Sequence, residues 1–542
     1  MGMRGCCRNN AKMEHFGGAL KYGDIKIKAS ITLPQLRSGV QHYVNFCNTR
    51  RVHSALQYKT PDGVYSGICN SANRGYISSK PLTPIFQKKL SSPRGQAQFF
   101  PKKKIRHDTD VYTGKDLIML FTDGRKWFHE KRYGMFVHWG IYAVGGMHEQ
   151  EQMRFQIPAD AYKKYMDQFN PVKFDPVQWL DMFQENGMEY LVFTAKHHDG
   201  FCMWDTKETP FNIMNTPYKK DIVGMLAQEC QKRDFPLEIY YSCVDWHHKA
   251  YPNLGRHHEI ETDPQYHDMD EYMAFLKNQI RELCSNYGPI HGIWWDVNVP
   301  EHVDESVHDL IRSLQPCAVI NNRGYGKGDY STPERSPIST DPLPFSNPVE
   351  ACDSISQNGW GYNKDGNYAA ARSMEQKIAG FTALGANFLL NAGPKPDGTF
   401  PERAEKLMGR IGRWYKKVAP ALRSGACPGI VKCPGVLCTG GGNVLNLILT
   451  SPPDSEELFV EGLDKVPLKV EHLNTGNEYK CTLDPTVRTL YRGRYLRILN
   501  MPVEEMQTEI QVLRLTFDPS VNFSQQTATQ ENNAGSLEND LI

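Results

Sequence analysis

Aromatic and hydrogen-bonding side chains recur in one setting in this sequence, directly after short apolar runs. Each run has the length of a buried strand, and the polar residues stand at its end. An aromatic ring beside hydrogen-bonding groups suits a sugar, which presents apolar C–H faces and a ring of hydroxyls. Any one of these side chains could instead be a satisfied core residue. Together they predict a carbohydrate pocket, formed by His138 and Trp139, by His197, His198 and Asp199, by Tyr240 and Tyr241, by Trp294, Trp295 and Asp296, and by Asn322 and Arg323.

Asp296 is the strongest candidate for a catalytic group. It ends the apolar segment IWWD (293–296), where a carboxylate is costly unless it has a role or a partner. The alternative is an aspartate that caps the following loop or helix. Cleavage of a glycosidic bond needs two carboxyl groups, one a nucleophile or base and the other an acid. Glu334 and Glu350 downstream, and Glu149 after the first strand, are the candidates for the second carboxyl.

No catalytic metal is predicted, although three His-His pairs occur at 197/198, 247/248 and 257/258. Adjacent residues on a strand point to opposite faces of the sheet. The His-Glu-x-x-His spacing of helical zinc sites does not occur in the sequence. The 14 cysteines include no Cys-x-x-Cys unit, and this pattern indicates free thiols or occasional disulfides.

The elements that must position these residues follow from the pattern after residue 121. Apolar runs such as 190–200, 237–242 and 290–298 alternate with stretches in which apolar residues recur every three or four positions, as in amphipathic helices. This alternation predicts parallel β-α units and, over about 300 residues, an α/β fold of the (β/α)₈ TIM-barrel type with its active site at the carboxyl ends of the strands. The rival is a doubly wound open sheet, but no Gly-x-Gly-x-x-Gly follows a strand.

The remaining segments differ in composition from the barrel, which we place at residues 121–424. Residues 425–518 contain short β runs separated by Gly, Pro and Asn turns, and they predict an antiparallel β-sandwich. Residues 519–542 are polar and predict a disordered tail. Residues 66–120 predict a linker, because Gly, Ser and Pro recur there, and residues 1–65 form a separate N-terminal fragment.

Charge divides the chain into two parts. Residues 1–107 hold 19 of the 62 lysines and arginines but 3 of the 61 acidic residues, a net of +16, and the rest of the 542-residue chain has a net of −15. This split predicts two pieces with different physical roles. No signal peptide and no run of about 18 apolar residues is visible. As encoded, the sequence therefore predicts no export and no membrane partner.

At these residues the sequence resembles the α-L-fucosidases of glycoside hydrolase family 29. The resemblance runs from about Arg125 to Leu422 and includes WFHEKRYGMFVHWGIYAVGG, YLVFTAKHHDGFCMWDTK, LEIYYSCVDWHH, IWWDVN, INNRGYGKGDYSTPERSP and NFLLNAGPKPDG. It implies a (β/α)₈-like barrel with a C-terminal sandwich, no cofactor, and a retaining exo-α-L-fucosidase. The implied substrate is a fucosylated oligosaccharide or glycoconjugate. Members of the family are usually secreted, periplasmic or lysosomal.

The resemblance also implies roles for individual residues. Asp296 matches the nucleophile, and Glu334 matches an acid/base glutamate in a Thr-x-Glu segment, with Glu350 as the alternative acid/base. Tyr240 could serve in place of Tyr241, because successive strand residues face opposite ways. The implied fucose-binding positions are His138, Glu149, His197, His198, Tyr241, Trp294, Arg323 and Trp360.

One position departs from the family pattern. Gln150 follows Glu149 where a tryptophan is common, which puts in question how the sugar packs beside Glu149 and leaves the two carboxyls unchanged. The alternative function is a carbohydrate-binding protein on a glycosidase scaffold that has lost turnover. Asp296, together with two candidate acids, favours the enzyme.

The basic head resembles a different protein, the end of an insertion-sequence transposase with an integrase core. The segments GCCRNNAKMEHFGGALKYGDIKIK and LRSGVQHYVNFCNTRRVHSALQYKTPDGVY carry the resemblance. That family holds two divalent metals through three acidic residues and cleaves DNA. Glu14 matches the third of these, whereas no residue of the chain matches the first two, and Gly17 and Val52 depart from the pattern. We therefore expect an inactive remnant and no functional nucleic-acid partner.

Overall fold

The computed structural model describes residues 121–252, 260, 267–297, 303–337, 345, 347–485 and 494–523. The head (1–65), the linker (66–120) and residues 524–542 of the tail lie outside this part of the chain, so the expectations for them stay predictions. Within the described ranges, no helix has both the length and the apolar character needed to cross a membrane.

Seven parallel strands form the central sheet, in the order β5-β4-β3-β2-β1-β7-β6. Segment 330–334 joins the two ends of this sheet. Tyr330 forms a parallel bridge with Asn321, directly after β5, and Glu334 forms one with Cys352 of β6. The sheet is thereby closed into an eight-stranded barrel, which confirms the (β/α)₈-like fold. The strands are β1 (Tyr133–Val137), β2 (Leu191–Lys196), β3 (Leu237–Ser242), β4 (Gly292–Asp296), β5 (Val319–Ile320), β6 (Glu350–Ser354) and β7 (Asn387–Ala392).

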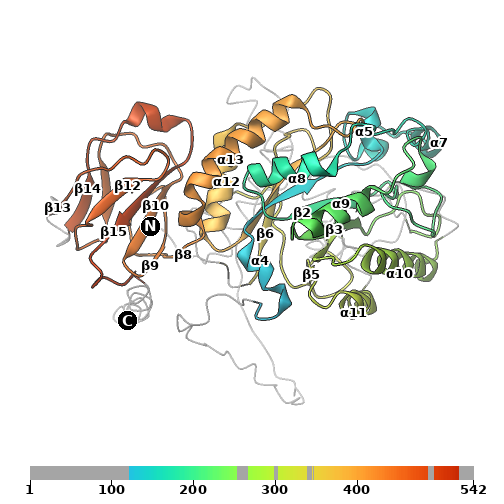
Figure 1. Ribbon diagram of the computed structural model, residues 1–542, viewed down its shortest axis with the longest axis horizontal. Coiled ribbons are helices and arrows are strands. Elements are labelled where there is room, and N and C mark those ends of the chain that lie inside the picture. Colours follow the sequence, from blue (N-terminus) through green and yellow to red (C-terminus); the bar gives the residue numbers. More distant parts are fainter. Residues whose placement is uncertain are drawn as a thin grey trace, which may run out of the picture. The chain divides into compact units, whose positions relative to one another are not determined.

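Helices alternate with these strands along the chain (Figure 1). The main ones are α8 (Pro176–Glu185), α9 (Ile222–Lys232), α10 (Met269–Asn286), α11 (Glu305–Leu314), α12 (Ala371–Ala383) and α13 (Glu402–Leu422). Helices α8 to α11 form where the sequence shows its amphipathic stretches. Each begins after an aspartate whose side chain accepts a backbone N–H of the first turn, which satisfies a donor that the helix itself leaves unpaired.

Shorter helices fill the connections around β1. They are η3 (Gly124–Lys126) and α4 (Trp127–Glu130) before the strand, and α5 (Tyr142–Gly145), α6 (Glu151–Arg154) and α7 (Ala159–Lys163) after it, with η4 (Ile213–Asn215) ahead of α9. Trp127 and Phe128 of α4 pack on Tyr190 and Tyr330 with ring centroids 5.8 and 4.7 Å apart. Because Tyr190 directly precedes β2, α4 closes the amino-terminal end of the barrel, opposite the expected site.

Side chains alternate between two hydrophobic layers along each strand. Tyr240 and Trp294 belong to the small cluster that fills the barrel interior, where they meet residues from other strands such as Phe136. Their neighbours Tyr241 and Trp295 belong to the large cluster between the strands and the helices. This period of two follows from the pleat of a strand. It decides which residue of each neighbouring pair can reach a pocket inside the barrel.

Two antiparallel sheets follow α13 and confirm the β-sandwich. One has the order β12-β15-β10-β9-β8 and the other β11-β14-β13. Leu447, Val460, Leu496 and Leu513 contribute to a hydrophobic cluster that both sheets share. The elements are β8 (Gly425–Ala426), β9 (Val436–Gly441), β10 (Val444–Leu449), β11 (Leu458–Glu461), β12 (Lys469–His472), β13 (Cys481–Pro485), β14 (Arg494–Ile498), η5 (Val503–Gln507) and β15 (Gln511–Thr516).

The barrel and the sandwich meet at a buried junction. Trp414 of α13 donates its indole N–H to the Ile510 carbonyl at 2.8 Å. Glu375 of α12 is fully buried and accepts the Ile510 N–H at 3.0 Å. Burial raises the pKa of Glu375 to about 7, so this carboxyl holds a proton over much of the acidic range.

Candidate active site

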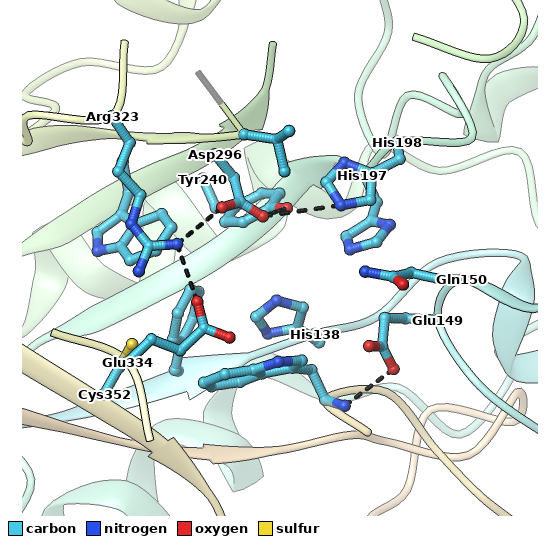
Figure 2. Close-up of a pocket in the computed structure, with 14 residues that line it drawn as sticks. His138, Glu149, Gln150, His197, His198, Tyr240, Asp296, Arg323, Glu334 and Cys352 are labelled. Atoms are coloured by element: carbon cyan, nitrogen blue, oxygen red, sulfur yellow. Dashed lines mark hydrogen bonds and ion pairs between the residues drawn. The ribbon is translucent and has the colours of Figure 1, made fainter. Parts of the chain in front are cut away.

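A cavity of about 310 Å³ lies at the carboxyl ends of the barrel strands, the end at which barrel enzymes carry their sites. Figure 2 shows side chains from several strands and loops directed into it. The residues that line the cavity are Phe136, His138, Glu149, Gln150, His197, His198, Tyr240, Trp294, Asp296, Val297, Arg323, Glu334, Cys352 and Trp360.

One arginine joins the two carboxyl groups of this cavity (Figure 2). Nη1 of Arg323 donates to Asp296 Oδ1 and to Glu334 Oε2, each at 3.0 Å. Two atoms that lie 3.0 Å from one nitrogen lie no more than about 6 Å from each other, so the two carboxyls are close neighbours. Thr332 fixes the guanidinium by accepting from Nε at 2.6 Å and from Nη2 at 2.8 Å.

Asp296 is held as a carboxylate. Burial alone raises its pKa, but the charges of Arg323 and His198 and the Tyr240 hydroxyl outweigh burial, and the pKa lies below its ordinary value. The Tyr240 hydroxyl donates to Asp296 Oδ2 at 2.6 Å, and His198 Nε2 lies 3.8 Å from the same oxygen. A carboxylate with these partners keeps its charge at neutral pH and presents a fixed oxygen to the cavity.

Glu334 stands in a more open setting at the same wall. Its side chain is 38% exposed, and its strand is held by the bridge to Cys352. The residues that directly follow the two carboxyls, Val297 and Arg335, both have left-handed backbone, with φ of 53° and 48°. Such a backbone costs about 1–3 kcal/mol per residue outside glycine. The surrounding contacts therefore hold both carboxyls in place against local strain.

Hydrogen bonds assign a proton to Nδ1 in two of the cavity histidines, His138 and His198. Asn391 donates both amide hydrogens, to Ser354 Oγ and to the Trp360 carbonyl, so its oxygen accepts Nδ1–H of His138 at 2.7 Å. Burial lowers the pKa of His138 to about 4. The ring is therefore neutral at pH 7, and its Nε2 is an acceptor for a hydroxyl.

His198 is oriented in the same way. The Ser242 hydroxyl donates its proton to the Val244 carbonyl at 2.7 Å, so its oxygen accepts Nδ1–H of His198 at 2.6 Å. His197 stacks on the Tyr240 ring at a centroid distance of 5.7 Å. The two adjacent histidines thus have different neighbours, since His198 lies beside Asp296 and His197 packs on Tyr240.

Glu149 and Gln150 form the opposite wall of the cavity. Glu149 is 1% exposed, and its Oε2 accepts the backbone N–H groups of Trp360 and Gly361 at 2.8 and 3.1 Å. Burial raises its pKa, but nearby His148 and the Gly361 N–H more than offset this and keep the pKa below its ordinary value. Gln150 Oε1 accepts from Arg154 at 3.1 Å, and Figure 2 shows the Gln150 amide nitrogen on the cavity side.

The structure brings together most of the residues expected from the sequence, but six of them do not line the cavity, namely Trp139, Asp199, Tyr241, Trp295, Asn322 and Glu350. Tyr241 points away from the cavity and donates to Gln279 Oε1 at 2.6 Å. The preference for Tyr241 over Tyr240 is therefore wrong, because the pleat turns Tyr240 inward. Glu350 is fully buried below the cavity and does not line it. The expected residues that do line it are His138, Glu149, His197, His198, Trp294, Asp296, Arg323, Glu334 and Trp360.

Three lining residues were not anticipated from the sequence. Phe136 lies two positions before His138 on one strand, so the period of two could have identified it. Val297 directly follows Asp296 and could have been inferred from that position. Cys352 belongs to the short strand EACDS, which has no apolar run to reveal it. No group of three or more His, Cys, Asp and Glu side chains in the described ranges could hold a metal ion, and the pair 257/258 lies outside those ranges.

Comparisons with known proteins agree with this site. A family profile described as Alpha-L-fucosidase matches residues 112–419, and one described as Integrase core domain matches residues 1–61, which confirms both resemblances. The chain is 27% identical over 322 residues to tissue alpha-L-fucosidase of Rattus norvegicus (54% of this chain, 68% of the relative) and 25% identical over 419 residues to that of Homo sapiens (71% and 87%).

Solved structures show the same likeness. Alpha-L-fucosidase isoenzyme 1 from Paenibacillus thiaminolyticus superposes with a TM-score of 0.65 at 28% identity, over 73% of this chain and 99% of that one. An alpha-L-fucosidase GH29 from Bacteroides thetaiotaomicron superposes with a TM-score of 0.61 at 27% identity, over 72% and 95%. The latter is described as a trapped covalent intermediate in complex with 2-fluoro-fucosyl fluoride.

Replacing the shared arginine should expose the repulsion that it prevents. We expect Arg323→Met to lower the free energy of unfolding at pH 7 by ~3 kcal/mol, because an uncompensated carboxylate is left in a buried site. Arg323 outweighs the effect of burial on the pKa of Asp296. Without Arg323, burial raises this pKa above its ordinary value in the folded variant, so Asp296 takes up a proton as the pH falls toward 4 and the buried charge is removed. The deficit of Arg323→Met should therefore shrink toward pH 4, measured by urea unfolding from pH 4 to 8.

The double variant Arg323→Met/Asp296→Asn should recover most of the loss at pH 7. Arg403→Met removes an exposed arginine that stacks on Tyr368 and serves as the control, with little change expected. A deficit of Arg323→Met that does not depend on pH, or that Asp296→Asn leaves in place, contradicts this assignment of charge.

Proposed function

Because the chain belongs to the α-L-fucosidase family of glycoside hydrolases, family 29, we propose that it is a retaining exo-α-L-fucosidase. Its substrates are oligosaccharides or glycoconjugates that carry a terminal α-linked L-fucose. Asp296 is the nucleophile, and Glu334 is the acid/base. A relative trapped as a covalent intermediate supports the covalent route.

The observation that carries this proposal is the placement of two carboxyls on one nitrogen of Arg323. Their bonded oxygens lie within about 6 Å of each other. Retaining glycosidases have their carboxyl groups about 5–5.5 Å apart, whereas inverting enzymes need about 6.5–9.5 Å to admit a water. The spacing of Asp296 and Glu334 therefore favours direct attack by one carboxylate.

In the first step, Asp296 attacks the anomeric carbon through an oxocarbenium-like transition state. Its ionised form is maintained by Arg323, His198 and Tyr240. Glu334 donates its proton to the glycosidic oxygen as the bond to the leaving group breaks. A fucosyl ester on Asp296 forms, and the aglycone leaves past Glu334, which stands at the exposed side of the cavity.

In the second step, Glu334, now a carboxylate, removes a proton from a water molecule that attacks the anomeric carbon. The ester to Asp296 breaks, and L-fucose leaves with its original anomeric configuration. Two inversions give net retention. Arg323 contacts both carboxyls, so it can stabilise the negative charge on Asp296 before the first step and on Glu334 after it.

The cavity suits a single terminal sugar. Its volume, about 310 Å³, is at the small end of ligand pockets, and the rings of Phe136, Tyr240 and Trp294 close its floor. His138 offers an acceptor to a sugar hydroxyl, and the Gln150 amide offers a donor. The faces of Phe136 and Trp360 suit the 6-methyl group of fucose. This arrangement supports exo action on fucose.

The roles of the two carboxyls can be separated with an aryl α-L-fucoside and azide. We expect Asp296→Gly to lower kcat by about 10⁴-fold or more, since a covalent step is lost. Azide should then enter from the opposite face and give β-fucosyl azide. Glu334→Ala should lose about 10²–10⁴-fold on a poor leaving group, and azide should give α-fucosyl azide through the intact ester. Product configuration is read by proton NMR.

A wild-type protein that binds L-fucose without turnover would favour the carbohydrate-binding alternative. The same azide anomer from both variants would contradict the division of roles between Asp296 and Glu334. Wild type with azide is the control, and it should release mainly L-fucose.

The neighbouring tyrosines provide a matched pair of substitutions. Tyr240→Phe removes the hydroxyl that donates to Asp296 at 2.6 Å, and a hydrogen bond to a charged group is worth about 1.5–3 kcal/mol. We expect kcat/KM to fall about 10- to 100-fold. Tyr241→Phe removes the bond to Gln279 and should lower thermal stability while kcat/KM stays near wild type. The opposite pattern would place Tyr241, not Tyr240, at the reacting centre.

A further inference from the structure

Beneath the floor of the cavity, the barrel interior holds two glutamates that the proposed reaction does not use. Glu238 lies on β3 and Glu350 begins β6, and both are 0% exposed. Glu350 Oε1 accepts the indole N–H of Trp294 at 3.0 Å, and its Oε2 accepts the Tyr190 hydroxyl at 2.7 Å. Glu238 Oε2 accepts the Tyr330 hydroxyl at 3.0 Å. The same hydroxyl also interacts with Glu350, so it lies between the two carboxyls.

No cation compensates these carboxyls within the part of the chain that the structure describes. Neither glutamate forms an ion pair with a described lysine, arginine or histidine, and the charge that acts on Glu238 is that of Glu350. Arg132 instead donates to the Asn387 side chain at 3.5 Å and to the Gly385 carbonyl. The groups that face the pair are the Tyr190 and Tyr330 hydroxyls, the Trp294 indole, the Cys352 thiol and the Asn387 amide.

Two buried carboxylates without a cation cannot both be ionised, because each charge loses its hydration and repels the other. Burial raises the pKa of Glu350 to about 7. Burial and the charge of Glu350 raise the pKa of Glu238 well above its ordinary value. The two groups therefore keep at least one proton between them below neutral pH and titrate as a unit.

Trp294 connects this pair to the cavity above it. Glu350 lies two residues before Cys352, the bridge partner of Glu334, which places Glu350 about 6.6 Å farther down the barrel. The Trp294 side chain binds Glu350 through its indole N–H and also lines the cavity. On its ring lies the Arg323 guanidinium, 4.8 Å from the ring centroid. Glu350 thus acts on the site through Trp294.

We propose that Glu238 and Glu350 form a proton-sharing pair that fixes the Trp294 indole under the sugar and, through its ring, the Arg323 guanidinium that joins the catalytic carboxyls. This makes Glu350 a positioning residue and removes it as a proton donor to the leaving group. An ionised carboxylate accepts hydrogen bonds more strongly than a neutral acid. Sugar affinity therefore changes near neutral pH through a group outside the cavity. The kinetic part of this proposal rests on the proposed fucosidase function.

The pair itself is tested by the pH dependence of stability in the full chain. Since the folded-state pKa values are raised above the ordinary value of about 4.5, the folded protein holds protons that the unfolded chain has released, and stability falls as the pH rises from about 4.5 to about 7. Glutamine binds no proton in this range. We expect Glu350→Gln and Glu238→Gln each to make this slope shallower by about one proton, measured by urea unfolding at successive pH values.

Glu375→Gln is the matched control. It removes another buried carboxyl whose pKa is about 7, at the junction with the sandwich. We expect the same shallower slope from Glu375→Gln and no change in KM. Glu350→Gln should raise KM about 3- to 10-fold, because an amide oxygen cannot accept from both Trp294 and Tyr190 as strongly as a carboxylate. Its kcat should stay within about threefold, and KM should no longer change with pH near 7.

Recovery of turnover by azide in Glu350→Ala, with α-fucosyl azide as the product, would overturn the proposal by making Glu350 the acid/base. A wild-type slope in both glutamine variants would overturn it as well, because no shared proton would then exist. The dependence of the unfolding free energy on pH can be measured without catalytic activity. It therefore also tests the proton-sharing pair if the chain proves not to be a fucosidase. If Glu350→Gln does not fold, Glu238→Gln provides both readouts.

Discussion

A single guanidinium between two carboxyl groups is the contact on which the site depends. Asp296 and Glu334 face the same small cavity, and without Arg323 between them their charges would repel at close range. Arg323 can serve both because Thr332 binds it on two nitrogens and the Trp294 ring supports it from one side. A lysine would offer the same charge without this fixed fork of donors. In the proposed mechanism, the arginine stays bound to both carboxyls while Asp296 is ionised and Glu334 exchanges a proton.

The barrel supplies this arrangement through the pleat of its strands. Residues two apart face the interior, so Glu238 and Tyr240 on β3 are stacked at successive depths, as are Gly292, Trp294 and Asp296 on β4. Near the mouth, a cation stands between two acids. Farther down, two acids stand without a cation among the described residues, and we infer that they keep a proton instead. Trp294 lies between the two pairs of acids, and we infer that it transmits the protonation state of Glu238 and Glu350 to Arg323.

The sequence predicted the barrel and Asp296 because both rest on local patterns. An apolar run that ends in a charged residue is visible without knowledge of the fold. The choice of Tyr241 was wrong, since the direction of the pleat depends on how β3 pairs with its neighbours. Glu334 was preferred to Glu350 through the family resemblance alone, and no local pattern supported that preference. Segment 330–334 contains Pro333 and joins the barrel through isolated bridges, so no apolar alternation reveals that it places Glu334 at the mouth.

The central claim, that Asp296 forms the covalent bond to the sugar, can be tested by trapping that bond. The protein is incubated with 2-fluoro-fucosyl fluoride, in which the fluorine slows release of the ester, and is then digested and sequenced by mass spectrometry. We expect the mass of one fluorofucosyl group on the peptide that contains Asp296, at the carboxyl group of that residue. A label on another carboxyl, or no label together with first-formed L-fucose of inverted configuration, would contradict the account.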